Sequence, residues 1–357
     1  MNNEPPLLKT RNLAVGYGSR RKKIIPIAGP LDVGIYAGQL ICLLGPNGSG
    51  KSTLLRTLSG LQPALGGTVE IAGAGDGRLK PSQLARKISL VLTEPVRTSN
   101  LTAGALVALG RYPYSDWLGI LSPADKAMVA WAIESTGIAA FLDRKVATLS
   151  DGESQKVMLA RALAQDTPLM MLDEPTAHLD LPSRIQLMQL LHQLARRTNK
   201  GILVSTHELD LALQVADEVW LLQAGGQISR GTPEDLVLNG IFETVFDKEG
   251  IHFDRATGTF NMHQGNGEQI VLTGEGAAAF WTKRALKRQG FTIAGEAGSA
   301  PGDAAENGGA TDVRQAAHSI RILEEQGRTV WISERGGQVL KYDSIESLLS
   351  ALKLIGK

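Results

Sequence analysis

Residues 45–53, Gly-Pro-Asn-Gly-Ser-Gly-Lys-Ser-Thr, are the stretch that most constrains the fold of this 357-residue chain. They follow the apolar run 39–44 and precede the helix-like segment STLLRTLSG, which ends at Gly60. Glycines at such a junction let backbone N–H groups turn toward a bound phosphate, and the helix N-terminus adds positive partial charge. A strand, a glycine-rich loop and a helix in this order predict a phosphate-binding loop.

The polar side chains of this loop suit a nucleotide and a divalent cation. We expect the Lys51 ammonium group to reach the β- and γ-phosphates, and the Ser52 hydroxyl to ligate Mg²⁺. A chance match is the alternative, and the strand before the loop and the helix after it argue against that alternative. The predicted nucleotide-binding residues of the loop are Gly45, Pro46, Asn47, Gly48, Ser49, Gly50, Lys51, Ser52 and Thr53.

Two acids, Asp173 and Glu174, end the apolar run that begins at residue 168. Beside a phosphate loop, a first carboxylate can hold the Mg²⁺ shell and a second can polarise an attacking water. Acids at strand ends are often only solvated, but the phosphate loop favours the functional interpretation. His207 follows the run ILVST, and ligands collect at such strand ends in open α/β sheets. Tyr17 could stack on a base or could be an ordinary half-buried strand residue.

An ordinary globular composition limits the classes of function. Hydrophobic residues make up 43% and charged residues 20%, and the net charge of +1 offers no general attraction to nucleic acid or anionic lipid. The single cysteine, Cys42, lies in an apolar run, so we expect a buried thiol and no disulfide framework. The first residues lack the pattern of a secretion signal and no apolar run approaches a membrane span, so we expect a cytoplasmic protein.

Short apolar strands alternate with helix-length segments from about residue 7 to residue 245, which predicts a mainly parallel sheet with helices on its faces. Two Gly-Gly pairs, at 66–67 and 225–226, predict tight turns in an antiparallel part. Residues from about 95 to 165 have more helical periodicity, which predicts a helical insertion. The predicted strands of the sheet are residues 39–44, 87–92, 168–173, 201–206 and 218–223.

The sequence changes in character after about residue 245. Residues 293–312 are rich in Gly and Ala with almost no large apolar side chain, which predicts a flexible loop. We expect a nucleotide-binding domain of residues 1–244 and a small accessory α/β domain of residues 245–357. The predicted elements of the accessory domain are strands at 268–274 and 328–334 and helices at 276–290 and 344–355.

Five separated motifs make roughly the first 240 residues resemble the ATP-binding subunit of an ABC transporter. The resemblance implies an α/β P-loop nucleotide-binding domain with a mixed sheet and a helical subdomain, which hydrolyses ATP with Mg²⁺. It also implies that Tyr17 stacks on adenine, that Glu174 is the catalytic base and that His207 is a switch near the γ-phosphate. The motifs, in the family's order, are the phosphate loop, LSDGE (149–153), LMMLDEP (169–175), AHLD (177–180) and STH (205–207).

The motif LSDGE accounts for a second small-residue turn before a helix. In the family that the chain resembles, this motif contacts the γ-phosphate held by the phosphate loop of a second subunit, so two chains enclose two nucleotides. The resemblance thus makes Ser150, Gly152 and Glu153 nucleotide-binding residues across a dimer. It also makes Asp180 the aspartate that crosses the dimer.

The acid at Glu153 departs from the family's usual pattern, which is Ser-Gly-Gly-Gln. One interpretation is a capping box, in which Glu153 bonds back to the Ser150 amide and favours the helix start. The other interpretation is a brake, because an acid beside the incoming γ-phosphate would weaken closure of the dimer. We favour the capping box.

A second departure lies after the predicted strand 87–92. The family's usual glutamine there touches Mg²⁺ and links the nucleotide to the membrane partner, whereas this chain reads Thr93-Glu94-Pro95. Thr93 aligns with the glutamine and is therefore a candidate residue of the Mg²⁺ shell. Glu94 is a neighbouring acid that could substitute as an acceptor.

The stretch Gly110-Arg111-Tyr112-Pro113 resembles the branch of the family that serves importers of iron–siderophore complexes, haem and vitamin B12. We expect this region to dock a short helix of the membrane subunits. The alternative is a turn in which Pro113 ends a helix and Tyr112 packs against its surface.

The resemblance therefore implies an ATPase that energises uptake of an iron chelate, haem or a cobalamin-type substrate. Its expected partners are a second copy of the chain, integral membrane permease subunits at the cytoplasmic face of the membrane and, indirectly, a substrate-binding protein, but no nucleic acid. The alternatives are a soluble ABC ATPase acting on ribosomes or DNA, and a nucleotide switch without hydrolysis. Soluble ABC ATPases usually carry two cassettes or long coiled coils, and this sequence has neither.

Overall fold

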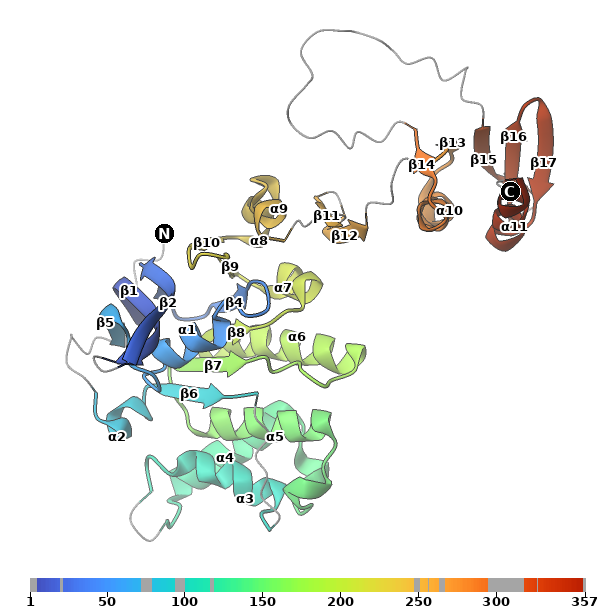
Figure 1. The fold of residues 1–357 in the computed structure, drawn as a ribbon. Coiled ribbons are helices and arrows are strands. Elements are labelled where there is room, and N and C mark those ends of the chain that lie inside the picture. Colours follow the sequence, from blue (N-terminus) through green and yellow to red (C-terminus); the bar gives the residue numbers. More distant parts are fainter. Residues whose placement is uncertain are drawn as a thin grey trace. The chain divides into compact units, whose positions relative to one another are not determined.

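The computed structural model describes residues 5–19, 22–71, 79–93, 100–115, 119–246, 251–255, 257–262, 267–294, 318–325 and 327–355. The chain forms two compact units, one of Met1–Lys248 with Phe253–Phe260 and one of Glu249–His252 with Asn261–Lys357. Figure 1 shows the elements of each unit. The sequence expectations for Glu94, for Pro95 and for most of the loop 293–312 lie outside the described residues.

A six-stranded sheet in the order β10-β9-β4-β8-β7-β6 forms the centre of the first unit. Its neighbouring strands are parallel except β10, which is antiparallel to β9. The five strands predicted from apolar runs are confirmed. The strands are β4 (Leu40–Leu44), β6 (Ile88–Val91), β7 (Leu169–Asp173), β8 (Gly201–Ser205), β9 (Glu218–Leu222) and β10 (Ile228–Gly231).

The central strands are buried on both faces. Cys42 and Leu44 belong to one apolar cluster, and their neighbours Ile41 and Leu43 belong to a second cluster on the other face. Burial on both faces explains why these strands are continuous apolar runs. Cys42 is fully buried, as predicted, and burial, together with the charge of Asp217, raises the pKa of its thiol to about 12. The thiol is therefore a packing group.

A second, antiparallel sheet joins β1 (Leu8–Ser19) to β2 (Lys22–Leu31), β3 (Gly34–Ile35) and β5 (Gly66–Ile71). The tight turn predicted at residues 66–67 is wrong, because both glycines begin β5. Gly67 has a φ of 75°, and a Cβ there would lie 2.2 Å from the Asn12 carbonyl oxygen, so this close approach needs glycine. The turn predicted at residues 225–226 is confirmed between β9 and β10.

Helices pack around the central sheet, and three of them, α3, α4 and α5, pack on one another. Single-turn 3-10 helices lie at Leu109–Arg111 (η1), Ala139–Phe141 (η2) and Val146–Thr148 (η3). The α-helices of the first unit are α1 (Lys51–Leu58), α2 (Pro81–Leu84), α3 (Ala103–Ala108), α4 (Pro123–Thr136), α5 (Asp151–Ala164), α6 (Leu181–Thr198), α7 (Leu209–Val215), α8 (Pro233–Leu238) and α9 (Ile241–Phe246). In the described part of the chain, no helix combines the length and apolarity needed to cross a bilayer.

A five-stranded sheet in the order β14-β13-β15-β16-β17, with two helices, forms the second unit. Its core includes Leu286, Trp331 and Leu348, and the Trp331 ring N–H donates to the Thr282 hydroxyl at 2.7 Å. The predicted strands and helices here are confirmed, and β14, β15 and β17 were not foreseen; β14 includes Ile293, the first residue of the predicted loop. The elements are β13 (Gln269–Thr273), α10 (Gly276–Arg288), β14 (Thr292–Ile293), β15 (His318–Glu325), β16 (Arg328–Arg335), β17 (Gln338–Tyr342) and α11 (Ile345–Ile355); β11 (Ile251–Asp254) and β12 (Thr259–Met262) form a separate pair.

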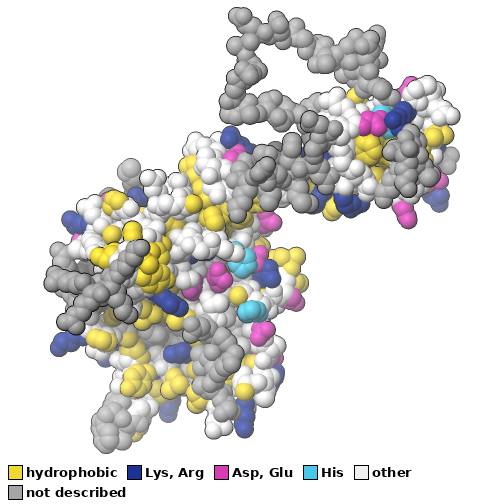
Figure 2. Space-filling view, in the orientation of Figure 1, with side chains coloured by type: hydrophobic (Ala, Val, Ile, Leu, Met, Phe, Trp, Pro, Cys, Tyr) yellow, Lys and Arg dark blue, Asp and Glu magenta, His cyan; other side chains and the backbone are white. Residues whose placement is uncertain are grey.

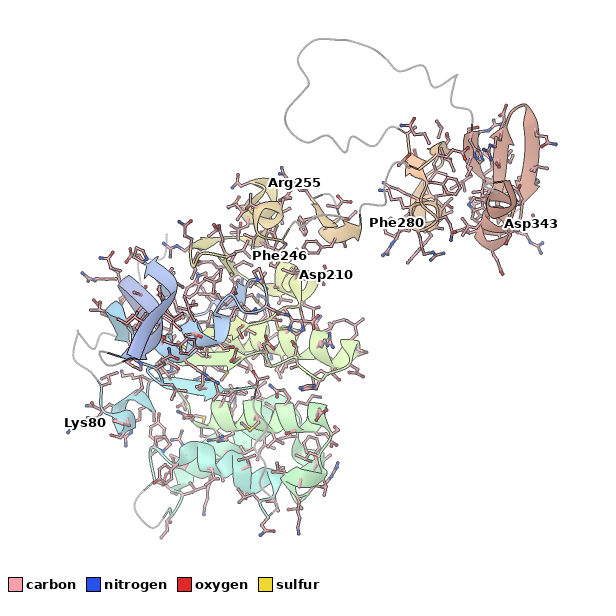
Figure 3. All side chains as sticks on the ribbon, in the orientation of Figure 1. Lys80, Asp210, Phe246, Arg255, Phe280 and Asp343 are labelled. Carbon is pink, nitrogen blue, oxygen red and sulfur yellow. The ribbon has the colours of Figure 1, made fainter. Side chains whose placement is uncertain are left out.

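The surface carries charges of both signs. Figure 2 shows Lys and Arg side chains interspersed with Asp and Glu side chains over the visible face, in keeping with the near-zero net charge. On α10, the exposed rings of Phe280, labelled in Figure 3, and Trp281 form an edge-to-face pair. The Arg284 guanidinium lies 5.7 and 5.3 Å from the two ring centres, which is within reach of a cation–π contact.

His318, at the start of β15, is a buried titratable group of the second unit. Its Nε2 lies 3.0 Å from the Ser333 hydroxyl, and its Nδ1 lies 3.5 Å from the Glu268 carboxylate, which also pairs with Arg335 at 3.1 Å. Burial lowers the pKa of His318; the charge of Glu268 opposes this shift and that of Arg335 adds to it. The ring is therefore held in its neutral form.

This burial predicts that the second unit loses stability on acidification. Because the folded-state pKa lies below the ordinary value of 6.5, the unfolded state binds the proton first, and stability falls as the pH drops through about 6.5. Protection factors for β15 and β16 amides in the full chain should decrease between about pH 7 and pH 5. His318→Asn should flatten this dependence, whereas His192→Asn, which changes a partly exposed histidine of the first unit, should not. An unchanged dependence in His318→Asn would contradict the assignment.

Candidate active site

The phosphate loop joins β4 to α1, and its last turn needs glycine. Gly50 precedes α1 with a φ of 102°. A Cβ at Gly50 would lie 2.1 Å from Cγ2 of Ile27, so any other residue would have to displace the Ile27 side chain and also adopt this unfavourable φ. The loop is thus built as the sequence predicts, in front of a helix N-terminus that suits an anion.

Two side chains of the loop fit a phosphate group. Lys51 Nζ donates to the carbonyl oxygens of residues 45 and 46 at 2.9 and 3.3 Å, so the ammonium group folds back over the loop. Burial lowers the pKa of Lys51, and the charges of Glu174 and Asp173 oppose that shift. The hydroxyl of Ser49 is buried and has no hydrogen-bond partner among the described residues. An orphaned hydroxyl in this loop fits a phosphate oxygen.

Ser52 and Asp173 meet although they are far apart in the sequence. The Ser52 hydroxyl donates to Asp173 Oδ1 at 3.1 Å, and the Ser205 hydroxyl donates to the same oxygen at 2.5 Å. Asp173 is buried at the end of β7. A hydroxyl and a carboxylate are hard oxygen donors, so this pair fits Mg²⁺.

Thr93, which follows β6, also lies at this point. Its hydroxyl donates to the backbone carbonyl oxygen of Asp173 at 2.9 Å. Thr93, which aligns with the glutamine of the resembled pattern, is therefore hydrogen-bonded to the backbone of Asp173, the predicted metal ligand. Thr93 belongs to the same cluster as Ser52 and Asp173.

Glu174 and His207 follow the ends of the adjacent parallel strands β7 and β8. Glu174 has a φ of 49°, and its N–H donates to the carbonyl oxygen and hydroxyl of Ser205 at 3.0 and 3.1 Å. Such backbone conformations are uncommon outside glycine and collect at functional sites. The His207 ring is half-exposed, and its Nε2 lies 3.4 Å from Glu208 Oε1.

Tyr17 of β1 is hydrogen-bonded to the first turn of α1. Its hydroxyl and that of Thr53 share a hydrogen bond of 2.6 Å. The ring is half-exposed, so it is anchored at one edge while part of its face stays accessible. This position agrees with both interpretations of Tyr17.

The capping box predicted at the start of α5 is confirmed. The Ser150 amide donates to Glu153 Oε2 at 2.9 Å, and the Ser150 hydroxyl accepts from the Glu153 amide at 3.3 Å. The sequence did not reveal the third member, Arg144, whose guanidinium donates to Glu153 Oε1 at 2.8 Å. The Ser150 amide and, after it, Arg144 lower the pKa of Glu153. Both carboxylate oxygens of Glu153 are thus occupied locally.

We therefore expect Glu153→Gln to leave function nearly unchanged. Glutamine can accept the same amide hydrogen bond from Ser150, so the start of α5 should be preserved. ATP hydrolysis and ATP-driven dimerisation should stay within about twofold of the unmodified chain. Glu153→Ala is the control that removes the cap and should weaken both. A clear gain of both properties in Glu153→Gln would show instead that the acid is a brake.

Asp180 begins α6 as its N-cap. Its Oδ1 accepts from the Ser183 amide at 3.1 Å, and hydrogen bonds from Ser183 lower the pKa of the Asp180 carboxyl. Within the described part of the chain, the side-chain hydrogen bonds of Ser150, Glu153 and Asp180 stay near their own helix starts, and none reaches residues 45–53. The predicted site residues therefore form one cluster around the phosphate loop and two separate helix starts.

Arg111 is buried in the protein interior, whereas its neighbour Tyr112 is exposed to solvent. Arg111 is 8% exposed, and it donates to Asp125 Oδ1 and to the Ala164 carbonyl oxygen, each at 2.8 Å. Its guanidinium also lies 4.0 Å from the Tyr114 ring centre. Arg111 is therefore an interior residue, and docking of a membrane-subunit helix by this region stays a prediction. The alternative of a turn is confirmed in part: the chain turns at residues 112–114 directly after η1, but Tyr112 is 75% exposed and does not pack against the helix surface.

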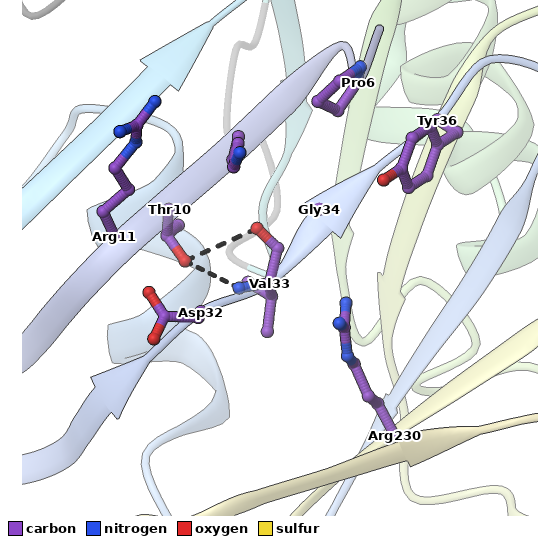
Figure 4. A pocket seen from close by; sticks show the side chains of 9 residues that line it. Pro6, Thr10, Arg11, Asp32, Val33, Gly34, Tyr36 and Arg230 are labelled. Atoms are coloured by element: carbon purple, nitrogen blue, oxygen red, sulfur yellow. Dashed lines mark hydrogen bonds between the residues drawn. The ribbon is translucent and has the colours of Figure 1, made fainter. Parts of the chain in front are cut away.

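A surface pocket of about 360 Å³ opens elsewhere on the first unit (Figure 4). Within it, the Thr10 hydroxyl accepts from the Val33 amide and donates to the Leu31 carbonyl oxygen, each at 2.9 Å. These bonds hold neighbouring strands together. The pocket contains none of the predicted site residues; its lining is Pro6, Lys9, Thr10, Arg11, Asp32, Val33, Gly34, Tyr36 and Arg230.

Comparison with known proteins finds two families along the chain. Residues 29–177 match the family described as ABC transporter, and residues 266–353 match the family described as Iron ABC transporter C-terminal domain. An uncharacterized ABC transporter ATP-binding protein of Methanocaldococcus jannaschii is 35% identical over 292 residues, which cover 81% of this chain and 99% of that protein. The iron(3+)-hydroxamate import ATP-binding protein of Bacillus subtilis is 35% identical over 239 residues, which cover 67% of this chain and 87% of that protein.

A solved structure shows the same architecture. It is a dimeric ATP-binding cassette in a post-hydrolysis state with ADP and Pi bound. It superposes with a TM-score of 0.56 at 27% identity and covers 63% of this chain and 98% of its own.

Proposed function

The chain belongs to the family of ABC transporter ATP-binding proteins, and we propose from this premise that it energises import of an iron chelate, haem or a cobalamin-type compound. It is an ABC-type ATPase, and the observation that carries this activity is the Ser52–Asp173 contact beside the phosphate loop. The substrate class is supported by the match of residues 266–353 to a domain of iron transporters. The hydroxamate-import relative supports it independently.

Each side chain around the phosphate loop has a distinct task in this proposal. Lys51 binds the β- and γ-phosphates of ATP and offsets the charge that develops as the γ-phosphoryl group departs. Glu174 orients and polarises the attacking water, and His207 contacts the γ-phosphate. Ser52 and Asp173, with Thr93 beside them, would hold Mg²⁺, which supplies further charge neutralisation when bound. Tyr17 stacks on the adenine ring.

Two copies of the chain complete the sites. Ser150, Gly152 and Glu153 of one copy close on the nucleotide held by the phosphate loop of the other, and Asp180 crosses the interface. The capping box uses the amides of Ser150 and Glu153, so the other amides of the first turn of α5, those of Asp151 and Gly152, are the ones that would face an anion from another chain. The dimeric cassette with bound ADP and Pi supports this arrangement.

The remaining parts of the chain serve the transporter assembly. We assign ATP binding to residues 1–244, with residues 95–165 as the helical subdomain, and an accessory role to residues 245–357. The chain sits at the cytoplasmic face of the membrane through permease subunits, and a substrate-binding protein delivers the cargo to these subunits. Exposed Tyr112 is the residue of the Gly110–Pro113 stretch that is available to a permease helix.

Reconstitution tests this function. The full chain with its permease in liposomes should hydrolyse ATP faster when a binding protein presents its iron chelate, haem or cobalamin, and labelled substrate should enter the vesicle lumen. Stimulation without uptake would contradict import. Hydrolysis that is unaffected by any permease would favour a soluble ATPase, and no hydrolysis in any condition would favour a nucleotide switch.

A further inference from the structure

Arg184, in the first turn of α6, joins two segments that the proposed function places at different nucleotides. Its Nε donates to the Leu179 carbonyl oxygen at 2.8 Å, and its Nη1 donates to Glu208 Oε1 at 2.5 Å. The same oxygen of Glu208 lies 3.4 Å from Nε2 of His207. One guanidinium thus contacts the residue before Asp180 and the residue after His207.

The two contacts of Arg184 are direct and partly shielded from solvent. The side chain of Arg184 is 31% exposed and that of Glu208 is 18% exposed, so both are largely screened from water. The planar guanidinium holds its donors in a fixed fork, so movement of either acceptor changes the geometry at the other. Leu179 itself is buried, which leaves its carbonyl little freedom to adjust.

From this geometry we infer that Arg184 is a positioning residue that couples the two ATP sites of the dimer. The inference rests on the proposed function, in which His207 contacts the nucleotide of its own chain and Asp180 reaches the nucleotide of the partner. A shift of His207 on γ-phosphate binding moves Glu208 and hence Arg184. Because Arg184 also holds Leu179, the shift reaches Asp180 and so the second site.

Loss of this link should reduce cooperativity. In the full chain, Arg184→Ala should lower the Hill coefficient of ATP hydrolysis toward about one and lower kcat on the order of fivefold or more. Nucleotide binding to the monomer should not change, since Arg184 contacts no residue of the phosphate loop in the described structure. Arg184→Lys keeps the positive charge but replaces the two donor nitrogens, Nε and Nη1, with one ammonium group that lacks the fixed fork, so it should fold normally and still lose cooperativity.

The chain offers a matched control on the same helix. Arg196 also makes two side-chain contacts, from Nη2 to Asp217 at 2.5 Å and from Nε to His192 at 3.2 Å, but it is 62% exposed and touches neither Leu179 nor Glu208. Arg196→Ala should therefore leave the Hill coefficient and kcat unchanged. An equal loss in Arg196→Ala would mean that any weakening of α6 has this effect, and would overturn the inference.

A double-mutant cycle tests whether Arg184 couples the two ATP sites through its contact with Glu208. If Arg184 acts through Glu208, the Arg184→Ala/Glu208→Ala double variant should lose no more cooperativity than the more affected single variant. Additive losses would overturn the inference, and so would a Hill coefficient in Arg184→Lys equal to that of the unmodified chain. If the unmodified chain itself hydrolysed no ATP, the proposed function would fail first. A failure confined to the Arg184 variants concerns the coupling alone.

Discussion

Glu174→Gln should lower ATP hydrolysis by about 10²- to 10⁴-fold, the range expected when a general base is removed. The amide keeps the size of the carboxylate but cannot accept a proton from the attacking water. ATP binding should persist, because the phosphate loop and the Ser52–Asp173 pair are untouched. The variant should accumulate as an ATP-bound dimer.

Two measurements on the purified chain check this prediction. Phosphate release reports turnover, and size-exclusion chromatography with ATP reports dimerisation. Glu134→Gln, which changes an exposed acid of α4, is the matched control and should behave as the unmodified chain. Hydrolysis near the unmodified rate in Glu174→Gln would remove Glu174 from the role of base.

Arg111→Ala should destabilise the first unit by roughly 3–5 kcal/mol, the usual cost of breaking a buried ion pair on one side. The substitution leaves the Asp125 carboxylate buried and without its cation, and it leaves the Ala164 carbonyl without a donor. Hydrogen bonds from Ser122, followed by that from Arg111, lower the pKa of Asp125, so the carboxylate stays charged. Chemical denaturation of the full chain, monitored in the first unit, measures the loss.

The neighbouring residue is the natural control. Tyr112→Ala should change stability by no more than about 0.5 kcal/mol, because the ring is 75% exposed. It should nevertheless weaken co-purification with the permease if the exposed ring is the docking group. The opposite pattern, a stable Arg111→Ala chain that fails to bind the permease, would make Arg111 the docking residue instead.

The sequence predicted the elements whose cause is local. The strands β4 and β7 are apolar runs with polar ends, and the start of α5 follows from the Ser150–Glu153 spacing. The cluster of Ser52 and Asp173 was also foreseeable, because parallel strands present their carboxyl ends at one edge of a sheet. Local pattern and sheet direction together therefore placed the chemistry around the phosphate loop.

What the sequence could not predict depends on packing between distant segments. Arg111 belongs to a stretch that the sequence suggests is a docking surface. It is nevertheless interior, because Ala164, 53 residues away, offers it a carbonyl oxygen. Arg184 meets Glu208 across 24 residues, and neither spacing nor composition marks the pair. Gly67 looked like half of a tight turn, but the approach of Asn12 makes it part of a strand. In each case the partner decides the role.

The burial of Cys42 makes the chain suitable for distance measurements. Its thiol is inaccessible, and its pKa of about 12 keeps it from forming the reactive thiolate at neutral pH. A cysteine introduced at an exposed position such as Tyr112 would therefore be the only residue that a maleimide probe labels. Paired spin labels or fluorophores could then follow the approach of two copies during a turnover cycle, without first replacing a native residue.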